Sequence, residues 1–166
     1  MRGVLRGHVA IGMMTSCPPD VITGTLAAFH DDHPGVAVTL IEAQSAGLLA
    51  RVREGAIDLA VVGFASPPGG GGIHVEIIND DVLVAAVEHR DTAAARKNIS
   101  LRALVDHDLI CLPRGAGIRA GLDEGCAVAR LQCRVALEAS NPEVVASRNR
   151  ARHALAKPTL LERAQR

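Results

Sequence analysis

Short apolar segments alternate with segments of helical periodicity along the first third of the chain. Residues 8–12, 36–42 and 58–63 are apolar runs of strand length. Each run is separated from the next by a segment long enough for a crossover helix. The order strand, helix, strand, helix, strand predicts a parallel sheet with right-handed connections.

The two intervening segments carry their own helix signals. The first helix is expected to open at residues 17–20, which contain two prolines and Asp20, and to stop before Pro34. The second is expected to have Ser45 as its cap and to end at Gly55. The apolar residues at helical spacing are Val21, Ile22, Leu26 and Phe29 in the first helix and Leu48, Leu49 and Val52 in the second.

A second series of elements is expected after the glycine-rich stretch 67–72, which has the composition of a flexible loop. The stretch lacks the Lys-Ser/Thr and the helix start that a phosphate-binding loop requires. Strands are expected at residues 73–78, 81–88, 109–112 and 134–138, and helices from residue 101, over 119–129 and from Asn141.

Composition places the 166-residue chain among globular proteins, since 48% of its residues are hydrophobic and 22% are charged. With no Trp, no Tyr and two Phe, it cannot build the aromatic platforms of single-strand nucleic-acid binders. No apolar run is long enough to span a membrane, and the N-terminus lacks the pattern of a secretory signal. We therefore expect a cytoplasmic protein.

The net charge of zero hides two segments of opposite sign. Residues 1–146 hold 12 Lys and Arg against 17 Asp and Glu, whereas residues 147–166 hold six against one. The order of elements predicts a first α/β lobe over 1–80 and a partial second α/β lobe over 81–146, and the change in charge predicts an atypical basic tail over 147–166. The arginines of that tail could bind nucleic acid weakly and in a salt-dependent manner.

The four cysteines, Cys17, Cys111, Cys126 and Cys133, form no CxxC pair and have no histidine at zinc-finger spacing. No metal site is expected. In a reducing cytosol they are expected to be small, buried hydrophobic residues. The alternative is a peroxide-sensing pair formed by Cys126 and Cys133, which lie seven residues apart.

Small polar residues follow each of the first three predicted strands. Thr15 and Ser16 follow the first strand, Gln44 and Ser45 the second, and Phe64 begins the segment after the third. Ligands of open α/β sheets bind beyond the carboxyl ends of the strands, where hydroxyls and helix-start amides suit a carboxylate. Helix capping by Ser16 and Ser45 is an alternative role that is compatible with binding.

The glycine-rich segment 112–121 could hold a dinucleotide pyrophosphate, but its GxGxxxG spacing departs from the usual fingerprint. A turn facing a cleft is favoured instead, with Arg114 or Arg119 available to a carboxylate. No nucleophile elbow occurs and the seven histidines are scattered. No catalytic set and no cofactor are therefore expected.

Several segments, in this order and spacing, resemble the effector-binding domain of LysR-type transcriptional regulators. The most specific is the run LLARVREGAIDLAV at residues 48–61. The resemblance covers residues 4 to about 146, and its other segments are residues 6–12, 26–29, 33–36, 99–104 and 113–119.

This resemblance implies a type 2 periplasmic-binding-protein-like fold of two α/β lobes, the second incomplete, with a small effector held between them. It implies no enzymatic activity, a homodimer, and lobe closure that acts on a fused DNA-binding module. Effector contacts implied by position are Ser16, Ser45, Phe64, the loop containing Pro113, Gly115 and Gly117, and Asn141.

The chain departs from the family pattern at both ends. The winged helix-turn-helix is absent, so this chain is not expected to read DNA by itself. After Ala146 the family continues its helix into a glycine-rich turn and an apolar strand, whereas this sequence turns basic. We expect either a truncated or frame-shifted product or a purposeful tail.

Two other functions share the implied fold. One is a stand-alone solute-binding protein, which needs an export signal. The other is an enzyme with an activated cysteine, for which Cys17 beside Ser16 is the candidate.

Overall fold

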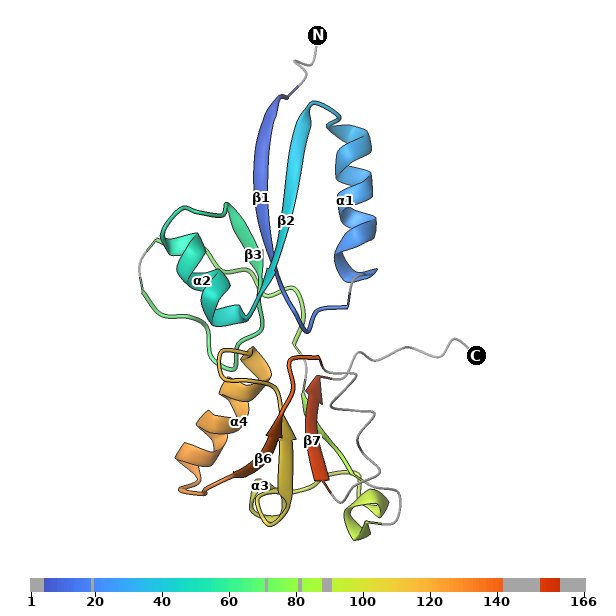
Figure 1. Cartoon of the computed structure of the whole chain (residues 1–166), viewed down its shortest axis with the longest axis vertical. Coiled ribbons are helices and arrows are strands. Elements are labelled where there is room, and N and C mark those ends of the chain that lie inside the picture. The colour runs from blue at the N-terminus through green and yellow to red at the C-terminus, as the bar shows by residue number, and fades with distance from the viewer. Residues whose placement is uncertain are drawn as a thin grey trace. The chain divides into compact units, whose positions relative to one another are not determined.

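The computed structural model describes residues 5–18, 20–70, 72–80, 82–87, 91–141 and 153–158, with the backbone alone at residue 21 and at 153–158. It divides the chain into two compact units. Unit 1 consists of residues 1–63 and 70–73, and unit 2 of residues 64–69 and 74–166. Figure 1 shows the elements of each unit by label.

Unit 1 is a three-stranded parallel sheet in the order β2-β1-β3. Its strands are β1 (Gly7–Met14), β2 (Val36–Ala43) and β3 (Leu59–Val61), and its helices are α1 (Asp20–Asp32) and α2 (Ser45–Arg53). These five elements confirm the predicted alternation of strands and helices, to within three residues at each end.

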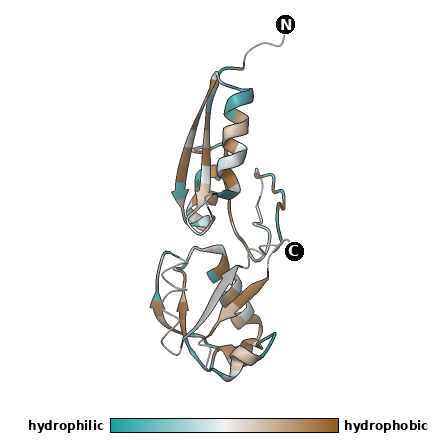
Figure 2. Ribbon diagram, turned by 90° about the vertical axis from the view of Figure 1, so that its right-hand side faces the viewer, coloured by the Kyte–Doolittle hydropathy of each residue, from teal (hydrophilic) through white to brown (hydrophobic). Residues whose placement is uncertain are grey.

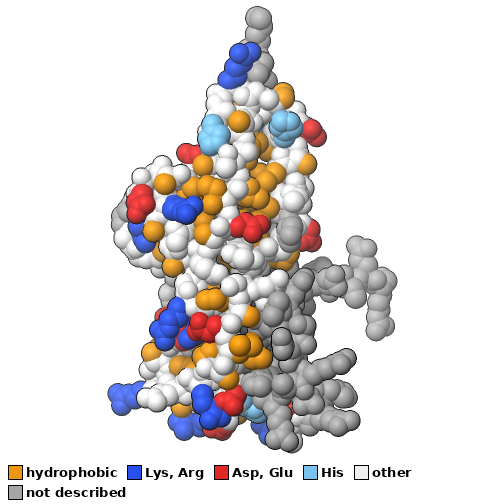
Figure 3. Space-filling model, viewed as in Figure 1, with side chains coloured by type: hydrophobic (Ala, Val, Ile, Leu, Met, Phe, Trp, Pro, Cys, Tyr) orange, Lys and Arg blue, Asp and Glu red, His pale blue; other side chains and the backbone are white. Residues whose placement is uncertain are grey.

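The two faces of the unit 1 sheet are packed differently. On one face, Ile11, Met13, Cys17 and Ile22 form a buried cluster, with Leu26 of α1 against it. On the other, Gly12 lets Leu48 of α2 and Ile57 approach the sheet, because a Cβ at Gly12 would lie 2.6 Å from Leu48 Cδ2. Figure 3 shows hydrophobic side chains on the surface of this unit, where Leu40 and Leu59 are exposed.

Unit 2 contains a four-stranded mixed sheet in the order β4-β7-β5-β6. β5 pairs in parallel with both β6 and β7, and β7 pairs antiparallel with β4. The strands are β4 (Leu83–Ala86), β5 (Asp108–Cys111), β6 (Arg134–Glu138) and β7 (His153–Pro158), and the helical segments are η1 (Thr92–Ala95), α3 (Leu101–Leu104) and α4 (Gly117–Val128).

β5 separates two apolar clusters because its side chains alternate. Leu109 and Cys111 pack with Leu104, Leu122 and Cys126 on one face. Ile110 lies on the other face in a cluster with Leu112 and Ala116. The hydropathy colouring of Figure 2 shows hydrophobic stretches along the strands of both units.

Three predictions for the second half meet different outcomes. The short helix after Ser100 is confirmed, since the Ser100 hydroxyl accepts a hydrogen bond from the amide of Ala103. The strand expected at 73–78 is wrong, because residues 72–80 form neither helix nor strand and Ile77 and Ile78 are exposed. The helix expected from Asn141 lies outside the described residues.

The C-terminal segment differs from the expected tail. His153–Pro158 form β7, which lies between β4 and β5 in the sheet of unit 2. These six residues therefore belong to the sheet, although the basic composition of 147–166 predicted a separate segment. No helix within the described ranges is long and apolar enough to cross a membrane.

Candidate functional site

The carboxyl ends of the three strands of unit 1 meet at one edge of the sheet. The amide of Thr15 donates to the carbonyl of Ala43, which joins the end of β1 to the end of β2 at 3.1 Å. Thr15 is exposed and Ser16 is half-buried. Two of the three predicted polar groups, Thr15 with Ser16 and Gln44 with Ser45, therefore lie at the strand ends of unit 1.

Ser45 occupies this edge as a buried hydroxyl, with 3% of the residue exposed. Its Oγ accepts a hydrogen bond of 3.2 Å from the amide of Gly63 and lies 4.0 Å from Sδ of Met14. The capping prediction is wrong for Ser45. The N-cap of α2 is Gln44, whose side chain makes no cap hydrogen bond. The Ser45 hydroxyl instead fastens the segment after β3 to the start of α2.

The contact between Ser45 and Gly63 was not predicted from the sequence. The strand order could have indicated this contact, because parallel strands in the order β2-β1-β3 bring the segment after β3 to the same edge of the sheet as the start of α2. Thioether sulfur is a weak acceptor, so the proton of Ser45 has only a weak partner in Met14.

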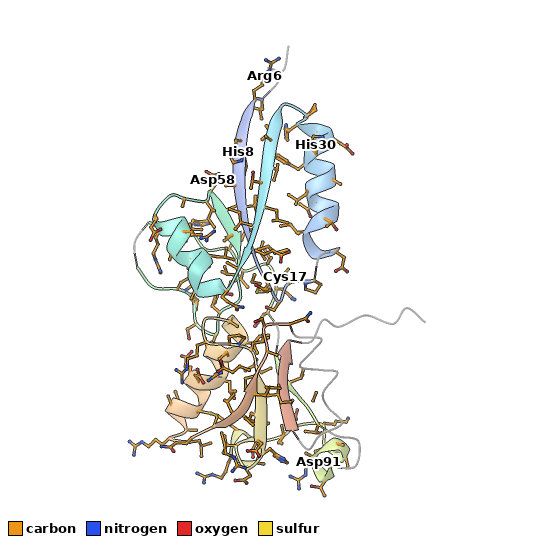
Figure 4. The ribbon with its side chains drawn as sticks, in the orientation of Figure 1. Arg6, His8, Cys17, His30, Asp58 and Asp91 are labelled. Atoms are coloured by element: carbon orange, nitrogen blue, oxygen red, sulfur yellow. A yellow bond between two sulfur atoms is a disulfide. The ribbon has the colours of Figure 1, made fainter. Side chains whose placement is uncertain are left out.

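Cys17, labelled in Figure 4, lies beyond the end of β1 and is buried. Its Sγ lies 3.7 Å from the carbonyl oxygen of Pro18, to which it can donate. Burial, and secondarily the negative charge of Asp20, raises the pKa of this thiol. A protonated, buried thiol is a poor nucleophile, which argues against the enzyme alternative built on Cys17.

The second group of predicted residues lies beyond β5 and β6 in unit 2. The loop from Pro113 is closed by a hydrogen bond from the amide of Ala116 to the carbonyl of Pro113, at 3.2 Å. Gly115 has φ of 96°, a conformation that favours glycine. Gly117 is the first residue of α4, and Asn141 lies exposed three residues past β6.

Arg119 is the buried charge at this end of unit 2, with 5% of the residue exposed. Its Nη1 donates to Glu138 Oε1 at 2.7 Å and to the carbonyl of Leu112 at 3.3 Å, and its Nε donates to Asp123 Oδ1 at 2.9 Å. Burial lowers the pKa of Arg119, but the hydrogen bonds to Glu138 and Asp123 outweigh it and raise the pKa.

The prediction that Arg119 is available to a ligand carboxylate is therefore wrong. Two protein carboxylates already bind its guanidinium, and it joins the ends of β5 and β6 to the first turn of α4. Arg114, the other candidate, is exposed. Glu138, the last residue of β6, forms the shortest of these contacts with Arg119.

Phe64 is half-buried and belongs to unit 2, together with the following residues 65–69. Within this segment the Ser66 hydroxyl donates to Glu124 of α4 at 3.0 Å. The structure therefore groups Thr15, Ser16, Gln44 and Ser45 in one unit and Phe64, Pro113, Gly115, Gly117 and Asn141 in the other. Among the described residues no three His, Cys, Asp or Glu side chains gather as a metal site.

Comparison with protein families matches residues 2–155 to the LysR substrate binding domain. The activator CmpR of Synechocystis is 25% identical over 145 residues, covering 87% of this chain and 47% of the relative. A probable hydrogen peroxide-inducible genes activator of Mycobacterium avium is 30% identical over 115 residues, covering 69% of this chain and 36% of the relative. The chain thus spans between about a third and a half of these curated relatives.

Solved structures show the same fold. The regulatory domain of Synechocystis CcmR in complex with 2-PG superposes with a TM-score of 0.78 at 21% identity, covering 97% of this chain and 77% of that one. The effector-binding domain of QuiR with shikimate gives 0.69 at 14% identity, covering 93% and 75%.

These matches confirm the predicted type 2 periplasmic-binding-protein-like α/β fold. The curated relatives are transcriptional regulators and not enzymes. The chain belongs to the LysR substrate-binding domain family.

Proposed function

We propose that this chain is the ligand-sensing region of a LysR-type transcriptional regulator and binds a small metabolite, most simply a carboxylate. The observation that carries the proposal is the edge of unit 1 where three parallel strands end. It presents the exposed Thr15, the half-buried Ser16 and Gln44, and the buried hydroxyl of Ser45. Neutral hydroxyls and backbone amides at such an edge bind anions without a basic side chain.

The residues of unit 2 implied by the family resemblance remain part of the proposal. The effector contacts we propose are Thr15, Ser16, Gln44, Ser45, Phe64, Pro113, Gly115, Gly117 and Asn141. Arg119 is not among them, because Glu138 and Asp123 occupy it. The negative charge of the effector is therefore assigned to the hydroxyls and amides of unit 1.

Membership of the same family supports a proposal for assembly and location. We propose a homodimer in the cytoplasm that contacts DNA through a helix-turn-helix region outside this chain, as the name of the HTH-type relative CmpR indicates. Effector binding would shift the population between two states of the regulator, and this shift would control transcription.

The test is calorimetric titration of the chain with 2-PG and with shikimate, the ligands named for two structural neighbours. The double variant Ser16→Ala/Ser45→Ala is expected to weaken the binding of a ligand held by the wild type by about 1–3 kcal/mol, because hydrogen bonds to a charged group are lost. This corresponds to a loss in affinity of roughly 5- to 150-fold.

Ser100→Ala is the matched control, since it removes a serine hydroxyl that caps α3 in unit 2. Thermal unfolding of all variants separates loss of affinity from loss of fold, because Ser45 also holds the amide of Gly63. Unchanged affinity in the folded double variant would remove both hydroxyls from the site.

A further inference from the structure

Two cysteines join the last turn of α4 to the start of β6. Cys126 is buried in α4, and Cys133 is half-buried directly before the first residue of β6. The structure joins their sulfur atoms in a disulfide across seven residues of sequence. The expectation of small, buried cysteines is confirmed for Cys17 and Cys111, which are free, whereas Cys126 and Cys133 are joined as in the alternative.

The opposite ends of α4 and β6 are held by a different bond. Arg119, in the first turn of α4, donates to Glu138, the last residue of β6. The helix and the strand are therefore fixed to each other twice, by an ion pair at one end and by the disulfide at the other. Figure 1 shows α4 beside β6.

The disulfide lies against the apolar cluster of unit 2. Cys126 packs with Leu122 and Cys111 in that cluster, and Cys133 packs against it. Cys111 is a third sulfur in the same cluster, but burial raises the pKa of its thiol. Cys111 is free in the structure, whereas Cys126 and Cys133 are joined, so Cys111 is expected to remain outside the exchange.

We propose that Cys126 and Cys133 form a reversible redox clamp between α4 and β6, opened by small thiols and closed by small disulfides. In the reduced state the cross-link is lost at one end of the two elements, while the ion pair of Arg119 and Glu138 remains at the other end, which carries the loop beginning at Pro113, and the apolar cluster still packs α4 against β6. The clamp acts on the fold of unit 2 and does not depend on the identity of the effector.

The closing reaction is two steps of thiol–disulfide exchange. The thiolate of Cys133, the more exposed of the two, attacks one sulfur of a small disulfide, forming a mixed disulfide and releasing one thiolate. The thiolate of Cys126 then attacks Sγ of Cys133, and a second small thiolate leaves. Both cysteine protons pass to the solvent, the cysteines lose two electrons, and the small disulfide is reduced to two thiols.

The first test counts thiols in the full chain. The protein is equilibrated with oxidised or reduced glutathione, unfolded in acid, alkylated with N-ethylmaleimide and weighed as the monomer. We expect two alkylated cysteines in the oxidised sample, Cys17 and Cys111, and four in the reduced sample. Peptide mapping should link Cys126 to Cys133. Four alkylated cysteines in oxidised glutathione would overturn the proposal.

Serine variants identify the pair. Cys126→Ser and Cys133→Ser should each lose the redox-dependent difference of two alkylations in the monomer. Cys111→Ser and Cys17→Ser should keep it, and they serve as matched controls for removal of a buried sulfur. A redox-dependent pair that persists in Cys126→Ser would overturn the assignment.

The second test asks whether the clamp restrains the structure. Hydrogen exchange is compared between oxidised and reduced wild type at equal pH and temperature. We expect exchange to rise several-fold on reduction in residues 127–135, and to change less near Arg119, where the ion pair remains. Strands β1 and β2 of unit 1 are the internal control. Identical exchange of residues 127–135 in the two redox states would overturn the clamp.

Discussion

Gly12 illustrates how a single backbone position sets the packing of unit 1. It is buried in β1, and a Cβ there would lie 2.6 Å from Leu48 Cδ2, 2.8 Å from Ile57 Cδ1 and 3.3 Å from Ala60 Cβ. Contacts below 3 Å require the neighbouring side chains to move. Leu48 is fully buried, so it has little room to do so.

Gly12→Ala is therefore expected to destabilise the protein by about 1–3 kcal/mol, the usual cost of overpacking a core. Urea unfolding monitored by circular dichroism measures the change. Gly47→Ala is the matched control, because nothing lies within 4 Å of a Cβ at this position in α2. It should be neutral or stabilising, by up to about 1 kcal/mol. Equal stability of wild type and Gly12→Ala would show that α2 shifts to make room for the added methyl group.

Among the charged residues described in unit 2, Arg119 is the one whose removal should lower the free energy of unfolding most. Arg119→Ala leaves Glu138 and Asp123 without their cation, and both carboxylates are 40–45% exposed in their side chains, so water can solvate them. We therefore expect a loss of about 1–3 kcal/mol, less than for a fully buried pair.

Chemical unfolding again measures this loss. Arg134→Ala is the control, since the Arg134 side chain is 74% exposed and its ion pair with Asp108 lies at the other end of β5 and β6. Its removal should change stability by less than about 1 kcal/mol. A larger loss in Arg134→Ala than in Arg119→Ala would contradict the ranking by burial.

Among the elements, β7 is the strand that connects β4 to the rest of the sheet of unit 2. It pairs with β4 on one side and with β5 on the other, so β4 and β5 are joined only through it in the described sheet. Removing a central strand leaves two rows of unpaired backbone groups, one on β4 and one on β5.

A chain ending at residue 152 should therefore lose the slow amide exchange of β5. A chain ending at Pro158 is the control and should keep it, because all of β7 is present. Hydrogen exchange followed by mass spectrometry measures the protection of β5 in both truncated chains. The amides of β1 should remain protected in each chain. Retained protection of β5 in the shorter chain would show that β7 is dispensable for the sheet.

Some elements were readable from local sequence and others were not. β6 was predicted at its observed bounds, Arg134–Glu138, and Ser100 at its observed cap position, because both depend on neighbouring residues. The strand expected at 73–78 has the right alternation but no partner strand among the described residues. β7 was missed because its sequence follows a basic segment and its pairing joins strands far apart in the chain.

At the scale of the whole molecule, the chain consists of two compact units, each with its own sheet and apolar clusters. The family match runs through both units, from residue 2 to residue 155. It extends beyond the point at which the charge distribution changes, near residue 146. Net charge describes solubility and partners rather than fold, so it was a poor guide to the end of the second unit.

The alternation of elements, the parallel sheet of unit 1 and the family were predictable from the sequence, because they depend on local periodicity and on the order of motifs. The contacts of the polar side chains became known from the folded structure. It assigned the Ser45 hydroxyl to the amide of Gly63, occupied Arg119 with Glu138 and Asp123, and joined Cys126 to Cys133. Each of these bonds connects different elements, and the partner of a buried polar group is fixed only when the chain has folded.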